Sequence, residues 1–337
     1  MKKILILSLA LVLLFGAVSC SKGGATEGKA AKSITLKMSE VHVDGYPTTL
    51  GDLEFARLVE EATDGRIKID VYTNGTLYGE ETGAIEALQV GDCAFARVSA
   101  SPVASYVPAL NAIQLPYLYM SSEHMWKVLN SEIGQGMLDQ VEASGSGLIG
   151  LCWYDSGSRS FYTKTPVHGP QDIKGLKIRM QNNQMMCRLV ELLGGTPVTG
   201  IGANEIYGAL TQGVIDGAEN NWPTYYTKGD YEAANYYCLD AHTRVPEIVL
   251  GSVEALKKVS ADDMKIIKEC AKKTQEFEIA EWKKLEATAE KAIREHGNVV
   301  YQPTDAELKG FAAAMEPIYA EYGKGYEDII AKIKAMN

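Results

Sequence analysis

The segment Asp172-Ile-Lys-Gly-Leu-Lys-Ile-Arg-Met180 is the stretch around which the rest of this chain can be organised. Its second half alternates apolar residues with Lys177 and Arg179, which is the period-two pattern of a half-buried strand. Gly175 stands at the turn before that strand, where free rotation about φ is useful. The alternation places Arg179 opposite the apolar face. Its guanidinium is then either a solvated surface charge or a cation that grips an anion in a cleft.

The N-terminus predicts export and an anchor. Two lysines precede the apolar run Ile4–Val18, a pattern typical of a secretory signal that is too short to span a membrane. We interpret residues 1–19 as a signal peptide and 20–32 as a flexible tether. The small residue before Cys20 resembles a bacterial lipoprotein cleavage box, although Ala17 replaces the usual leucine. The alternative is an ordinary cleaved signal with an incidental cysteine.

Composition excludes several classes of function. The 337 residues carry a formal net charge of −10, which disfavours nucleic-acid binding. The six cysteines and five histidines are widely spaced, so neither a disulfide framework nor a metal site is expected, and no cofactor is predicted. Beyond the signal no apolar run approaches the ~20 residues of a spanning helix. The remaining chain is long enough for two lobes with a cleft between them.

The order of the predicted elements indicates an α/β fold. Strands expected at Ile34–Met38, Arg66–Thr73 and Ala94–Val98 alternate with helices, which implies parallel strands with helical crossovers. The pattern repeats beyond residue 157, and a helix from Ser260 to Gly297 is long enough to lie across both lobes. Terminal helices are expected at Asp305–Met315 and Ile318–Ile333. Lobe I is predicted to comprise residues 33–156 plus 247–286, and lobe II residues 157–246 plus 287–337.

Motifs along almost the whole chain resemble one family. The chain looks like a substrate-binding protein of a tripartite ATP-independent periplasmic (TRAP) transporter, from the dicarboxylate-binding-protein superfamily. The resemblance implies a two-lobed periplasmic-binding-protein-like fold, each lobe a mostly parallel sheet flanked by helices, with the long helix spanning both lobes. The motifs occur in the order of the family: Phe55-Ala56, Val59-Glu60 and Gly65-Arg66-Ile67; Asn74-Gly75 with Leu77; Gln89 with Gly91; Leu115-Pro116-Tyr117; Asp172 with Gly175–Arg179; Glu205-Ile206-Tyr207, Ala209-Leu210 and Gly213; Asp216-Gly217 with Glu219-Asn220.

The resemblance implies a set of ligand-binding residues. Arg179 occupies the position of the arginine that forms a salt bridge with the ligand carboxylate, Arg159 that of an assisting arginine, and Asn220 that of an asparagine contacting the same group. The chemistry agrees, because a guanidinium fork matches a carboxylate and an amide adds a neutral donor. Arg159 is alternatively a surface residue near a hinge, and Asn220 a turn or cap residue. We assign Asp216 and Glu219 mainly to structure, with Glu219 able to fix Arg159.

Three further residues are predicted to bind ligand with less support from the pattern. Arg97 ends a predicted parallel strand, where ligands bind in such sheets, but an internal ion pair is an equal alternative. Trp222 and Tyr225 follow Asn220 closely enough to wall a pocket, and Trp222 could equally belong to the core. One departure from the family pattern is the spacer Val198–Asn204, which is longer than the commonest form and carries no aromatic residue.

The predicted function is that of an extracytoplasmic binding protein rather than an enzyme. The protein is expected to be periplasmic, held to the membrane by a lipid at Cys20, and to deliver a carboxylate-bearing organic acid to an ion-gradient-driven TRAP permease. Dicarboxylates, 2-oxo acids, sugar acids and aromatic acids all suit one arginine clamp. An ABC-type or sensory binding protein is an alternative. An enzyme would have to use Asp216 with Glu219, or His168 near Ser158.

Overall fold

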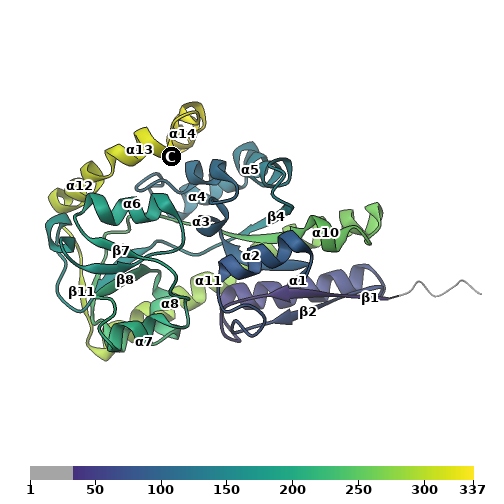
Figure 1. Ribbon diagram of the computed structural model, residues 1–337, viewed down its shortest axis with the longest axis horizontal. Helices are drawn as coiled ribbons and strands as arrows, with labels where there is room; N and C mark the ends of the chain where they lie inside the picture. Colours follow the sequence, from purple (N-terminus) through teal and green to yellow (C-terminus); the bar gives the residue numbers. More distant parts are fainter. Residues whose placement is uncertain (1–32) are drawn as a thin grey trace, which may run out of the picture. The chain divides into compact units, whose positions relative to one another are not determined.

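The computed structural model describes residues 33–337, which build two β-sheets with helices packed against them (Figure 1). The predicted signal peptide, tether and lipidated Cys20 therefore lie outside the described residues. Among the helices of residues 33–337, none has the length and apolar composition needed to cross a membrane.

The first sheet has five strands in the order β2-β1-β3-β10-β4. Parallel pairs join β2 to β1 and β1 to β3, whereas β10 runs antiparallel to both of its neighbours. The strands are β1 (Ile34–Ser39), β2 (Ile67–Tyr72), β3 (Phe95–Ser99), β4 (Leu148–Tyr154) and β10 (Glu247–Ser252).

The second sheet has six strands in the order β11-β9-β5-β8-β6-β7. Here β5 runs antiparallel to both neighbours, and the other three pairs are parallel. The strands are β5 (Ser160–Thr163), β6 (Lys177–Arg179), β7 (Thr196–Val198), β8 (Gly217–Asn220), β9 (Tyr236–Cys238) and β11 (Val299–Tyr301).

The expectation of mostly parallel sheets is confirmed, because in each sheet a single strand runs against the others: β10 in the first and β5 in the second. The two reversed strands are β5 and β10. Each is the first strand that the chain forms after it crosses, without an intervening helix, from one sheet to the other. β5 follows β4 of the first sheet, and β10 follows β9 of the second.

The helices cover these sheets and close most of the apolar core (Figure 1). They are α1 (Pro47–Ala62), α2 (Glu81–Val90), α3 (Ala100–Val103), α4 (Ser122–Leu129), α5 (Glu132–Ala143), α6 (Gln184–Leu192), α7 (Ile206–Thr211), α8 (Trp222–Thr227), α9 (Asp230–Ala233), α10 (Val253–Leu256), α11 (Ala261–His296), α12 (Asp305–Ala314), α13 (Glu316–Tyr322) and α14 (Glu327–Ala335), with 3₁₀ turns η1 (Pro108–Ile113) and η2 (Pro170–Ile173).

The long helix α11 is confirmed and packs against elements of both sheets. It contacts α1 and β4 on the side of the first sheet and α8 on the side of the second. The Ser260 hydroxyl accepts a hydrogen bond from the amide of Asp263 at its start. Gly297 ends it in the left-handed region, at φ 97°. Its 36 residues span ~54 Å at 1.5 Å per residue.

The last predicted helix, Ile318–Ile333, is wrong as a single element. The structure breaks it into α13 and α14 between residues 323 and 326. Gly325 there has φ 87°, a left-handed conformation that stops a helix and that glycine adopts readily. The apolar spacing on either side resumes with the right period, which is why the pattern alone did not show the break.

The parallel strands of both sheets end at the same region of the fold. β1, β3, β6 and β8 finish at Ser39, Ser99, Arg179 and Asn220, respectively. In α/β proteins ligands bind outside the carboxyl ends of parallel strands. The fold therefore brings the ends of four strands, from two sheets, toward a single candidate site.

Candidate ligand-binding cavity

A cavity lies between elements of the two sheets, and most of the side chains around it are polar. The lining residues come from strand ends and from the loops and helix starts that follow them: Val41, His42, Gly79–Thr82, Ser99, Pro102, Arg159, Arg179–Asn182, Gly200–Ala203, Asn220, Asn221, Thr224 and Glu247.

Arg179, the last residue of β6, lines the cavity with most of its guanidinium unused. Nε donates a hydrogen bond of 2.9 Å to the carbonyl of Ile201. In the part of the chain that the structure describes, neither terminal nitrogen of Arg179 has a hydrogen-bond partner. Burial lowers the pKa of this guanidinium, and the nearby Glu219 only partly offsets that effect. A half-buried cation with two free nitrogens is a suitable site for an anion.

Arg159 also lines the cavity, but its guanidinium is already paired. Its Nε and one terminal nitrogen both bond to the carboxylate of Glu219, the latter over 2.8 Å, and that nitrogen also bonds to the Glu219 carbonyl. Burial raises the pKa of Glu219, but Arg159 outweighs it and brings the value to about 2. The prediction that Glu219 fixes Arg159 is confirmed, and Arg159 is not a surface residue, since only 2% of it is exposed.

A buried histidine continues this ion network behind Glu219. His242 places Nδ1 2.7 Å from Asp240 and Nε2 3.4 Å from Glu219. Burial lowers the pKa of His242, but the two carboxylates outweigh it and raise the value to about 9. The ring is therefore a cation at neutral pH, and it holds the carboxylate that in turn holds Arg159.

Asn220 lies on the same face as Arg179. The two residues come from adjacent parallel strands in which Arg179 pairs with Ala218, so a residue two positions beyond Ala218 points to the same side. The Asn220 side-chain oxygen accepts a hydrogen bond from the amide of Asn221 over 2.9 Å. Among the described residues its side-chain nitrogen has no partner, which leaves a donor toward the cavity.

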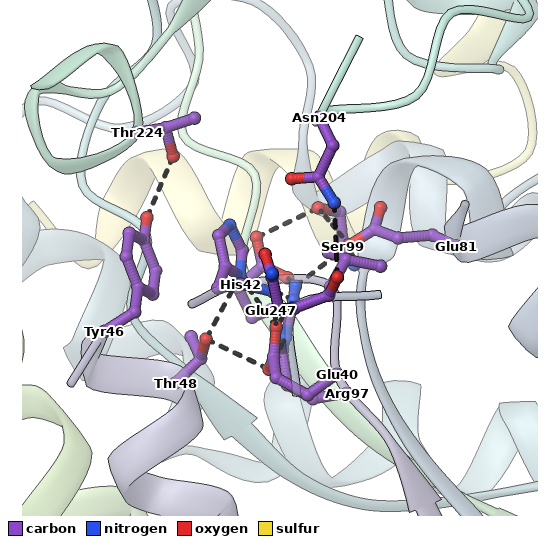
Figure 2. Close-up of polar contacts among 12 residues, drawn as sticks. Glu40, His42, Tyr46, Thr48, Glu81, Arg97, Ser99, Asn204, Thr224 and Glu247 are labelled. Atoms are coloured by element: carbon purple, nitrogen blue, oxygen red, sulfur yellow. Dashed lines mark hydrogen bonds and ion pairs between the residues drawn. The ribbon is translucent and has the colours of Figure 1, made fainter. Parts of the chain in front are cut away.

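Arg97 is not among the residues that line the cavity. It is 1% exposed and lies within a group of carboxylates (Figure 2). Nε donates to Glu40 over 2.7 Å, and one terminal nitrogen bridges Glu81 at 2.9 Å and Glu247 at 2.6 Å. A buried cation requires such partners. Its contacts match the internal ion pair named as the alternative, and no free nitrogen supports the predicted contact with ligand.

Trp222 and Tyr225 belong to an aromatic cluster rather than to the cavity lining. Trp222 stacks on Tyr237 with ring centroids 4.0 Å apart, and Tyr225 contacts the same ring at 4.9 Å. Both are buried, as core side chains are. Their helix α8 instead presents Thr224 to the cavity, and this hydroxyl lies 2.9 Å from that of Tyr46 (Figure 2).

The structure adds polar lining residues that the sequence patterns did not select. Ser99 and Gln181 lie at or just beyond the ends of β3 and β6, so a systematic inspection of strand ends would have found them. Glu81 begins α2. Glu247 gave no such signal: it begins β10, and it reaches this edge only because β10 is antiparallel and pairs Glu247 with Ser99.

The spacer at Val198–Asn204 forms one wall of the cavity. Gly200 to Ala203 all line it, and the Ile201 carbonyl is the group that holds Arg179. A side chain at Gly202 would meet Glu80 at 3.2 Å and the Gly79 carbonyl at 3.3 Å. The spacer therefore lies against the start of α2, which packs on the first sheet.

The residues considered for an enzyme have structural contacts. Asp216 accepts a hydrogen bond of 2.8 Å from the amide of Lys177, and Glu219 pairs with Arg159. The His168 ring packs on Tyr301, 4.2 Å between centroids. Within residues 33–337 no three His, Cys, Asp or Glu side chains are grouped so as to hold a metal ion.

Comparison with known sequences matches this chain to a protein family. Residues 38–325 match the model of bacterial extracellular solute-binding protein, family 7. A curated solute-binding protein from Chromohalobacter salexigens is 34% identical over 320 residues, covering 92% of this chain and 94% of that protein.

Solved structures of similar chains contain bound sugar acids. A TRAP periplasmic solute-binding protein from Pseudomonas putida F1 with bound D-glucuronate has a TM-score of 0.86 at 34% identity, covering 90% of this chain and 97% of the other. A TRAP periplasmic solute-binding protein from Xanthobacter autotrophicus Py2 with bound β-D-galacturonate has a TM-score of 0.85 at 31% identity, with coverages of 89% and 99%.

Proposed function

Because this chain belongs to family 7 of the bacterial extracellular solute-binding proteins, the solute-binding family of TRAP transporters, we propose that it captures a uronic acid. Arg179 and Asn220 bind the ligand carboxylate in this proposal, and Arg159 contributes positive charge from its fixed place beside Glu219. The observation that carries it is the guanidinium of Arg179, which lines the cavity with two nitrogens free for a carboxylate.

The choice of a uronic acid rests on similarity and on the polar lining of the cavity. The two solved relatives described above contain D-glucuronate and β-D-galacturonate. Polar side chains surround most of the cavity. A carboxylate clamp at one end and hydroxyl-binding groups elsewhere are what a sugar acid requires.

Calorimetry on the mature protein tests this proposal. D-Glucuronate and D-galacturonate are titrated into wild type and Arg179→Ala, with succinate as a short dicarboxylate for comparison. We expect micromolar or tighter binding of at least one uronate and loss of that binding in Arg179→Ala. A variant that binds the uronate as tightly as wild type would exclude the carboxylate clamp.

The two sheets are, in this proposal, the cores of two lobes that close on the ligand. We propose lobe I as residues 33–156 plus 247–286 and lobe II as residues 157–246 plus 287–337. The chain passes between the sheets after β4, after β9 and along α11, which supports a hinge of three segments. The closed form would then deliver the acid to the membrane subunits of a TRAP permease.

The anchor at Cys20 is also a proposal, and its support is the sequence alone. An apolar run ends in a small residue directly before that cysteine, and a polar tether follows. Labelling of the expressed full-length chain with radioactive palmitate, compared with Cys20→Ser, tests it. Equal labelling of the two chains would show that Cys20 is not the acylated residue.

A further inference from the structure

The two sides of the cavity differ in charge. Arg159, Arg179 and the amide of Asn220 come from the second sheet or directly beside it. Glu81 and Glu247 line the cavity from the first sheet: Glu247 belongs to that sheet and Glu81 begins the helix that packs on it. A ligand that reaches both sheets therefore meets cations of the second and carboxylates of the first.

The acidic side has more carboxylates than cations. Arg97 is bonded to three of them, Glu40, Glu81 and Glu247 (Figure 2). The neighbouring His42 does not add charge, because burial and the proximity of Arg97 lower its pKa to about 4. One guanidinium thus bonds to three acids. Burial, only partly offset by Arg97, raises the pKa of Glu247 to about 7, so this carboxyl is mostly ionised at pH 8.

The same side offers acceptors that lack donors. Every hydrogen bond to the Glu81 carboxylate in the described chain uses Oε1, which leaves Oε2 free. The side-chain oxygen of Gln181 is buried without a partner. The orientation of that amide follows from its neighbour: the single proton of the Ser99 hydroxyl goes to a carboxylate, Glu247 at 2.9 Å or Glu81 at 3.4 Å, so the Gln181 group 2.9 Å from Ser99 must be the nitrogen.

We propose that Glu81, Glu247 and Gln181 select the ligand by accepting hydrogen bonds from its hydroxyl groups and by repelling a second carboxylate. The cavity would then prefer acids with one carboxylate and several hydroxyls over dicarboxylates of the same length. Hydroxyl groups supply the donors that Glu81 Oε2 and the Gln181 oxygen lack, whereas both oxygens of Glu247 already have a donor and contribute mainly negative charge. A second carboxylate supplies none and stands among like charges that Arg97 does not balance. This inference rests on the proposed function and names the residues that set its selectivity.

The test compares D-glucuronate, a pyranose ring, with D-glucarate, an open chain of the same six carbons with a carboxylate at each end; the part of their affinity ratio that is due to charge is read from the glutamine variants. Dissociation constants of both acids are measured by calorimetry at pH 8 for wild type, Glu81→Gln and Glu247→Gln. Since like-charge contacts cost several kcal/mol, we expect wild type to bind D-glucarate about 100-fold more weakly than D-glucuronate. Each glutamine variant should reduce that ratio by about tenfold, because it removes one negative charge and adds a donor.

Glu86→Gln is the matched control, because Glu86 is an exposed carboxylate on the same helix as Glu81 and does not line the cavity. Its ratio should equal that of wild type. Melting curves show whether each variant is folded. If wild type binds D-glucuronate and D-glucarate equally well, the inference is overturned without any variant. Equal ratios in wild type and both folded glutamine variants would overturn it too. Failure of wild type to bind either uronate would instead reject the proposed function.

Discussion

Two arginines line one cavity, and their partners separate their roles. Two of the three nitrogens of Arg159 bond to Glu219, which is itself held by His242. Arg179 has only its Nε occupied, by a backbone carbonyl that carries no full charge. An ion pair that is already complete resists competition from a ligand, whereas a free fork gains a charge-assisted bond when an anion arrives. The ligand carboxylate should therefore depend most on Arg179.

Arg179→Lys tests whether the fork or merely the charge matters. Lysine keeps the charge but cannot bind a carboxylate through two parallel bonds. Losing one charge-assisted bond of ~1.5–3 kcal/mol predicts roughly 10- to 100-fold weaker uronate binding by calorimetry. The melting temperature should not fall, because no carboxylate of the described chain bonds to Arg179. Arg188→Lys, at an exposed arginine, is the control. Unchanged affinity in Arg179→Lys would show that the fork is not used.

The buried His242 predicts a dependence of stability on pH. Its pKa is about 9 in the folded protein and near the ordinary 6.5 in the unfolded chain. A raised pKa means that its stabilisation is complete below pH 6.5 and is lost as the pH rises toward 9 and beyond. The shift corresponds to a contribution on the order of 3 kcal/mol. The difference in melting temperature between wild type and His242→Gln should be largest near pH 6 and small at pH 9.5. A difference independent of pH would mean that His242 is neutral in the folded state.

At the scale of elements, the spacing of apolar residues and the residues that begin or end helices predicted most of the fold. The alternation around Arg179 gave β6, which the structure places at Lys177–Arg179. Ser260 and Gly297 gave both ends of α11, since a capping hydroxyl and a left-handed glycine act locally. Arg179 and Asn220 were placed at one ligand group by the resemblance to the family, and the structure puts their strands side by side. In each case the determining interaction is near in sequence or follows from the sheet order.

The features that the sequence did not reveal depend on contacts between distant segments. β10 has the apolar composition of a buried strand in either direction, so nothing local showed that Glu247 would lie opposite Ser99. The charge of Arg97 likewise gave no sign of its partners, because Glu40, Glu81 and Glu247 come from three other elements. Trp222 and Tyr225 were candidates by proximity to Asn220, but the helix turns their rings into the aromatic cluster instead.

The spacer loop Val198–Asn204 is predicted to affect ligand binding through the space between the two walls of the cavity. Gly202 lies against Gly79 and Glu80, and its backbone needs no left-handed conformation, so only space limits a side chain there. Gly202→Val should separate the two walls and weaken uronate binding by roughly 5- to 100-fold, mainly through faster dissociation in stopped-flow experiments. Gly208→Val, where an added carbon meets only Gln212 at 3.8 Å, should bind as wild type does. Equal dissociation rates in the two variants would show that the spacer does not close the cavity.

At the scale of the whole described chain, polar contacts join the elements of the two sheets around the cavity. Gln181, after β6, bonds to Ser99 of β3, and Asn183 bonds to the carbonyl of Ser101 over 2.7 Å. On another side Lys228 reaches the carbonyl of Val41 over 3.3 Å. In the lobe closure proposed above, these bonds join the two lobes and would distinguish the closed form from the open one.

The hydrogen bond between Tyr46 and Thr224 offers the sharpest test of the proposed closure. It joins the start of α1 to α8 through two side chains alone, over 2.9 Å. Tyr46→Phe removes one hydroxyl and leaves the ring stacked on His42. If the bond forms only on closure, its loss disfavours the closed form by about 0.5–1.5 kcal/mol, and the affinity for a uronate falls by roughly 2- to 10-fold.

The ligand-free Tyr46→Phe variant should then also show a larger radius of gyration in X-ray scattering than ligand-free wild type. Tyr226→Phe, on the same helix as Thr224, should change neither quantity. An unchanged affinity in Tyr46→Phe together with a lowered melting temperature would mean that the bond persists in both forms and stabilises the fold rather than its closure.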